Sequence, residues 1–157
     1  MKPLIKFLTI LFFFISFASC NSEEATVATE NVVFKAYLNG DNIVPANNSV
    51  GMGIATLIFN PNTNGFSIIV QYSGLSATSA TIYNNQGVTA TDLVASFSGL
   101  VSETIYYGSI NSAQKDDLFA NNFILNLHSS NFPDGEICGH LIKQNNDGFP
   151  PPPPGKM

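Results

Sequence analysis

The sequence predicts an all-β protein, an antiparallel β-sandwich or Greek-key barrel of seven or eight strands with one short helix. Short runs rich in β-branched and aromatic residues recur along the chain, and turn-forming Gly, Pro, Asn and Asp residues separate them. Only one segment has helical features. Short strands joined by short loops pack as two sheets or as one closed sheet, because each strand buries one face.

The first part of the domain predicts three strands. Residues 32–38 alternate between apolar and polar, and the Asn-Gly turn signal of Asn39-Gly40 follows them. Residues 53–59 and 66–72 flank a loop rich in Pro, Asn and Gly. We expect these two runs to form a hairpin.

The second part predicts five further strands around one helix. The helix is expected over residues 113–120, with Ser112 as its N-cap and with Leu118 and Phe119 on its buried side. The expected strands are residues 80–83, 93–97, 105–110, 123–128 and 136–142.

The first 19 residues have the layout of a secretory signal. Lys2 and Lys6 provide a positive start, and residues 7–18 are apolar except for Thr9 and Ser16. A transmembrane helix needs about 20 apolar residues. We therefore expect residues 1–19 to be removed as a signal peptide.

Phe17-Ala18-Ser19-Cys20 resembles the bacterial lipobox, in which small residues precede a cysteine that is acylated. Phe17 departs from the usual leucine, and the alternative is a free cysteine beside a conventional cleavage site. Glu23-Glu24 is similar to the surface-export signal of Bacteroidota lipoproteins. The resemblance implies a protein of the cell envelope, held in the outer membrane by lipid on Cys20 and exposed at the surface.

Charge excludes one class of partner. The mature chain, residues 20–157, has four lysines and no arginine against eleven acids, which gives a net charge of −7. Binding to nucleic acid needs clustered Lys or Arg, so no nucleic acid is expected as a partner. With Cys20 acylated, Cys138 has no partner for an intramolecular disulfide.

The two ends of the mature chain differ from the domain between them. Residues 20–30 are polar and predict a lipidated tether. Residues 145–157 contain the five prolines 150–154, which cannot join a sheet, and they predict a disordered or semi-rigid Pro-rich tail. The β domain is thus expected over residues 31–144.

The most distinctive motif is Asn126-Leu127-His128, followed after a short loop by Pro133-Asp134-Gly135-Glu136-Ile137-Cys138-Gly139-His140-Leu141. It resembles the ending of the CHRD domain, the repeat first named in chordin. Residues 34–40, Val44-Pro45 and Gly51-Met52-Gly53 are similar to the opening of that family. The resemblance covers about residues 32–144 and implies a β-sandwich in an extracellular setting, without an activity that can be transferred.

The chain departs from the family pattern at sites that matter for metal binding. Many members have a His-x-His motif where this chain has Thr81-Ile82-Tyr83. Two such imidazoles point to one side of a strand and suit a metal, whereas threonine and tyrosine offer no comparable nitrogen ligands. Cys138 and His140 replace the family's Arg and Gln.

Four kinds of catalytic or metal-binding site are conceivable for these residues. The first depends on how the last two strands pair. If the numbers of paired residues sum to an even value, one face of the hairpin carries Asn126, His128, Glu136, Cys138 and His140. These side chains could then form a zinc site or an oxidoreductase-like site. A superoxide-dismutase-like site needs more than two histidines. A Cys-His nucleophile lacks a visible oxyanion loop, and the carboxylates Asp92, Glu103 and Glu136 have no selective spacing.

The preferred hypothesis is a non-catalytic binding or structural module without metal or cofactor. Its partners would be the membrane, through lipid on Cys20, and an extracellular protein or a glycan. We expect His128 to lie opposite Glu136, with a carboxylate or a loop carbonyl holding the imidazole. The residues assigned structural roles are Asn126, His128, Pro133, Gly135, Glu136 and Gly139.

Overall fold

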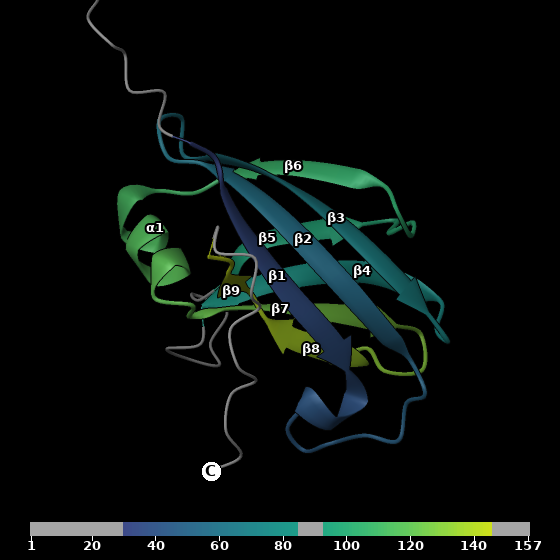
Figure 1. The fold of residues 1–157 in the computed structure, drawn as a ribbon. Coiled ribbons are helices and arrows are strands. Elements are labelled where there is room, and N and C mark those ends of the chain that lie inside the picture. Colours follow the sequence, from purple (N-terminus) through teal and green to yellow (C-terminus); the bar gives the residue numbers. More distant parts are fainter. Residues whose placement is uncertain (1–29, 85–92, 146–157) are drawn as a thin grey trace, which may run out of the picture.

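The computed structural model describes residues 30–84 and 93–145 (Figure 1). Four parts of the sequence analysis lie outside the described residues. They are the predicted signal peptide, the predicted acylation site Cys20 with nearly all of the tether, Asp92, and the Pro-rich tail from residue 146. Within the described part of the chain, no helix is long and apolar enough to cross a membrane.

The described residues form nine strands, one 3-10 turn and one α-helix. In chain order they are β1 (Val32–Asn39), η1 (Gly40–Asn42), β2 (Met52–Asn60), β3 (Gly65–Ser73), β4 (Ala77–Asn84), β5 (Leu93–Ser98), β6 (Ile105–Ser109), α1 (Ser112–Phe119), β7 (Phe123–Ser129), β8 (Ile137–His140) and β9 (Ile142–Lys143).

The strands form one antiparallel sheet that curls into a nearly closed barrel, so the predicted all-β class is confirmed. Their order in the sheet is β5-β4-β7-β8-β1-β2-β3-β6, and β9 pairs with β1. In Figure 1, β1, β2, β3 and β6 form the near layer, while β4, β5, β7 and β8 lie behind it. The two end strands approach each other, with the rings of Phe97 and Tyr106 5.3 Å apart.

Alternation along the strands builds a single core between the two layers. Every second residue of β1, β2 and β3 points inward, and β4 and β7 do the same from the opposite layer. The predicted hairpin of β2 and β3 is confirmed, with Phe59 paired to Phe66 beside its turn. The largest fully buried side chains are Phe34, Phe59, Phe123, Leu38, Leu57, Ile68, Ile82, Leu118, Leu125, Leu127, Ile137 and Leu141.

The helix covers one end of the barrel. Phe119 packs edge-on against Phe34 and Phe59, with ring centroids 5.8 and 5.9 Å apart, and Leu118 is fully buried. The predicted N-cap Ser112 is wrong by one residue. Asn111 is the cap, because its side chain accepts from the N–H of Gln114 while the Gln114 side chain accepts from the N–H of Asn111.

The last predicted strand, residues 136–142, is divided in two. Both β8 and β9 pair with β1, through Asn39–Cys138 and Phe34–Lys143, but Leu141 between them donates its N–H to the carbonyl of Phe123 on β7. Leu141 is fully buried in the core, and the pairing with β1 is interrupted at this residue.

Candidate functional site

The CHRD-like motif forms the hairpin of β7 and β8, which we call the signature hairpin. Asn126 pairs with Cys138 and Ile124 with His140, so partner numbers sum to 264, an even value. The same register continued by one residue puts His128 opposite Glu136. The polar side chains of both strands therefore share the face directed away from the core, which is the condition set by the metal hypothesis.

His128 is buried, and both of its ring nitrogens have partners. Nδ1 lies 2.9 Å from the carbonyl oxygen of Pro133, and Nε2 lies 2.7 Å from Oγ1 of Thr81 on β4. A carbonyl can only accept, so Nδ1 carries a proton and donates it to Pro133. In the neutral ring Nε2 then accepts from the Thr81 hydroxyl. Of the two expected holders of the imidazole, the loop carbonyl is the one observed.

Glu136 is only 6 % exposed, and its carboxylate is bonded to a different loop from the one that holds His128. Its Oε1 accepts from Oγ of Ser49, 2.7 Å away, and its backbone oxygen accepts from Nδ2 of Asn47 at 2.8 Å. Its N–H donates to the carbonyl of Leu127 at 2.7 Å. Glu136 thus ties the segment between η1 and β2 to the signature hairpin.

Two glycines of the motif allow close backbone contacts. Gly135 has a φ of +137°, and a Cβ there would collide with the side-chain amide of Asn126. That amide donates to the carbonyl of Asp134 at 3.2 Å. At Gly139 a Cβ would collide with the carbonyl oxygen of Tyr37 on the neighbouring strand. A side chain at Gly135 would displace Asn126 within the hairpin, and a side chain at Gly139 would push β8 away from β1.

Cys138 and His140 do not complete a reactive centre. Burial raises the pKa of the Cys138 thiol to about 11, so the thiol is protonated at neutral pH and is a poor nucleophile or metal ligand. His140 is half-buried opposite Ile124. Across residues 30–84 and 93–145, no three His, Cys, Asp or Glu side chains lie close enough together to hold a metal ion.

The even register alone therefore does not create a metal or oxidoreductase site from His128, Glu136, Cys138 and His140. The shared face is divided, because His128 is held towards Thr81 and Glu136 towards Ser49. The two strands do pair with numbers that sum to an even value, as the metal hypothesis requires. The expected convergence of metal ligands is nevertheless wrong for the described residues.

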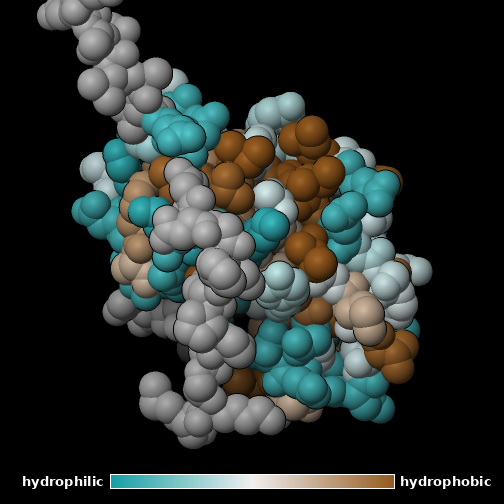
Figure 2. All heavy atoms as spheres, in the orientation of Figure 1, coloured by the Kyte–Doolittle hydropathy of each residue, from teal (hydrophilic) through white to brown (hydrophobic). Residues whose placement is uncertain are grey.

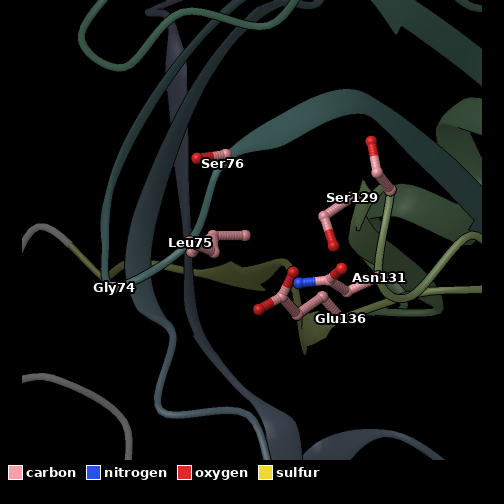
Figure 3. Close-up of a pocket in the computed structure, with 7 residues that line it drawn as sticks. Gly74, Leu75, Ser76, Ser129, Asn131 and Glu136 are labelled. Carbon is pink, nitrogen blue, oxygen red and sulfur yellow. The ribbon is translucent and has the colours of Figure 1, made fainter.

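A polar groove lies beside the signature hairpin, with a volume of about 360 Å³. In Figure 3 the side chains of Glu136 and Asn131 lie next to each other, and Leu75 lies across from them. The groove is lined by Gly74, Leu75, Ser76, Ser129, Ser130, Asn131 and Glu136. Hydroxyl, amide and carboxylate groups in this arrangement can hydrogen-bond a small polar ligand.

Several of these contacts were missed by reasoning from the sequence. Ser49 lies 87 residues from Glu136 in the chain, and Thr81 lies 47 residues from His128. No spacing pattern links residues so far apart. The one signal that could have drawn attention to Thr81 was the departure from the His-x-His pattern, which marks the strand position facing His128.

A second surface has a different character. The outward side of β1, β2, β3 and β6, which we call the outer face, carries six large apolar side chains that are exposed. Tyr107 is 75 % exposed and Tyr37 is 64 % exposed. In Figure 2 hydrophobic side chains gather over the near layer of strands. The six residues are Tyr37, Met52, Ile54, Ile58, Ile105 and Tyr107.

Comparison with protein families agrees with this geometry. The model of the CHRD domain matches residues 34–141, from the core of β1 to the end of the signature hairpin. No curated protein and no solved structure matches the chain significantly. The family match covers more than half of the chain and includes both the opening strand and the hairpin with its Pro-Asp-Gly-Glu turn. The chain therefore belongs to the CHRD domain family.

Proposed function

We propose that this chain is an exported, lipid-anchored protein of the cell envelope, exposed at the outer-membrane surface, whose CHRD domain acts by surface contact and not by catalysis. The export signal and the lipobox-like residues before Cys20 support the location. The CHRD domain itself is a small β module.

The observation that carries the non-catalytic role is how the polar groups of the signature hairpin are used. Both ring nitrogens of His128 are bonded, Glu136 is buried against Ser49, and the Cys138 thiol is protonated. An acid-base or nucleophilic residue needs a group that is free to meet a substrate. In this hairpin the side chains of His128 and Glu136 instead bond to neighbouring loops and strands.

The outer face supports the second half of the proposal. Large apolar side chains that remain exposed on one contiguous patch of a small domain mark an interaction surface. A macromolecular partner suits this face, whereas the polar groove beside Glu136 suits a hydroxyl-rich ligand such as a glycan. We assign the partner contact to the outer face, because it exposes six large apolar side chains to water.

The anchor can be tested by substituting each cysteine separately. Cys20→Ala removes the acylation site, and we expect the protein to move from the membrane fraction to the soluble fraction while its circular dichroism stays that of a β protein. Cys138→Ala is the matched control, and it should remain with the membranes. Unchanged membrane association of the Cys20→Ala protein would contradict the lipid anchor.

A further inference from the structure

We propose that the outer face binds a second copy of this chain, so that two barrels pack sheet against sheet in a twofold dimer. This inference rests on the proposed function, because it names the partner for the contact surface described there. Its evidence is the extent, the continuity and the charge of the outer face.

The extent of the face fits an interface. With fully exposed large side chains offering about 200 Å² each, the six exposed residues together present on the order of 600 Å² of largely apolar surface. Typical monomers have a largest apolar patch of about 300–600 Å², and a standard interface buries about 800 Å² per partner. The outward residues between them are half-buried or exposed, so they add to the surface that a partner could cover; they are Val33, Lys35, Thr56, Ser67, Ile69 and Gln71.

The strand register makes this surface continuous. Tyr37 pairs with Ile54 across β1 and β2, and two residues along the strands Ile69 pairs with Ile105 across β3 and β6. Ile54 and Ile69 are diagonal neighbours, since Thr56 is the direct partner of Ile69. The apolar side chains thus extend across four adjacent strands, as they do on the inner faces of stacked sheets.

Charge favours a second copy over a charged partner. Lys35 is the single charged residue among the outward positions of these strands, so the face offers no pattern to select an acidic or basic surface. A bilayer is a poorer fit, because interfacial surfaces carry several Lys or Arg residues around their apolar part. A patch that is largely apolar and carries one charged residue can pack against the same patch of a second copy, as a twofold contact requires.

The opposite layer exposes fewer large apolar side chains. Outward positions of β4 and β7 are mixed, with polar Ser79, Thr81 and Asn126 beside Tyr83 and Ile124, and Leu93 is the one exposed large apolar residue on the described strands of that layer. The loops before β2 and before β8 also bond to this side, through Ser49 and Pro133. On the outer face one loop bond of this kind is present, from Nε2 of Gln71 to Oε1 of Glu103 at 3.3 Å, and the six large apolar side chains stay exposed.

The test is sedimentation equilibrium of the chain carrying Cys20→Ala, which removes the predicted acyl group. We expect a monomer-dimer equilibrium with a dissociation constant in the micromolar range, as for weak interfaces of this size. Because each mature copy has a net charge of −7, raising NaCl to about 1 M should tighten the dimer by screening repulsion. An association driven by opposite charges would weaken instead.

Two substitutions place a charge in the interface. Ile54→Lys and Tyr107→Lys should each raise the dissociation constant by about tenfold or more, because every dimer would bury the lysine twice. Leu93→Lys is the matched control, since Leu93 on β5 is 42 % exposed, as Ile54 is. It should leave the dissociation constant unchanged. The wide exposure of Tyr107 keeps the Tyr107→Lys protein folded if Ile54→Lys disturbs the barrel.

A monomer at all concentrations, or a dimer that both variants leave intact, would overturn the proposal. So would face-dependent binding of a monomer to vesicles of phosphatidylethanolamine and phosphatidylglycerol, because that result would assign the face to lipid. The lipid anchor is tested separately by membrane fractionation of the Cys20→Ala and Cys138→Ala proteins, so failure of the dimer is distinguishable from failure of the anchor.

Discussion

Glu136 and His128 face one another across the signature hairpin, yet each stabilises a different connection. Glu136 holds the segment before β2 through Ser49, and His128 holds the hairpin loop through the carbonyl of Pro133. A buried polar group left without its partner costs about 1–3 kcal/mol, more than the net gain of a typical hydrogen bond. The polar residues of the motif therefore stabilise the domain because they give buried hydrogen-bonding groups a partner.

We expect Glu136→Ala and His128→Ala each to lower the free energy of unfolding by about 1–3 kcal/mol. For a domain of this size the melting temperature should fall by roughly 4 °C per kcal/mol. Glu136→Gln keeps an oxygen that can accept from Ser49, so it should have a smaller effect. Thermal unfolding followed by circular dichroism measures both changes. Unchanged melting temperatures, with a binding activity lost in both alanine variants, would show that the pair serves function instead of structure.

At the scale of elements, α1 is a short helix that depends on its cap and on its place in the barrel. Its eight residues are too few to be stable alone, so tertiary packing must hold it. Asn111 and Gln114 satisfy backbone groups at its start, while Phe119 contacts Phe34 and Phe59 near its end. Cap and packing together position the helix over the barrel end.

Asn111→Ala should destabilise the domain by about 1 kcal/mol, because the N–H of Gln114 loses its acceptor. Ser112→Ala is the control, since Ser112 is the first helical residue and is exposed. Chemical denaturation of both variants gives the comparison. A larger loss from Ser112→Ala than from Asn111→Ala would contradict the assigned cap.

At the scale of the whole molecule, the barrel separates two surfaces by polarity. The layer of β4, β7 and β8 turns its polar side outward and carries the groove, whereas β1, β2, β3 and β6 expose the apolar outer face. The core between them is continuous from Phe34 to Leu127. This asymmetry leaves the apolar outer face as the side of the domain to which we assign the proposed contact.

The same architecture separates the groups that would bind a metal. We expect the purified domain to contain no stoichiometric zinc or copper, because His128 is bonded to Thr81 and Pro133 and the Cys138 thiol has a raised pKa. Elemental analysis of protein prepared without chelators measures this. About one metal ion per chain, lost in the His128→Ala variant, would contradict the expectation.

Much of the fold could be predicted from local patterns. Alternation with a period of two located the strands, and the Pro-Asn-Gly loop after Asn60 located the first hairpin, because side-chain direction and turn geometry are local properties. The signature hairpin was likewise visible from its Pro-Asp-Gly turn. The family followed from these same residues.

The contacts that define the candidate site were decided only by the tertiary structure. Ser49 reaches Glu136 and Thr81 reaches His128 because the curled sheet brings β4 beside β7 and the segment before β2 beside β8. The outer face also depends on sheet order, since exposed residues of four strands form one patch only when β6 pairs with β3. The sequence alone determined which residues alternate and where the chain turns, because neighbours along the chain control these features. Pairing between distant segments depends on how the whole core is buried, and a pattern of neighbouring residues carries no information about that.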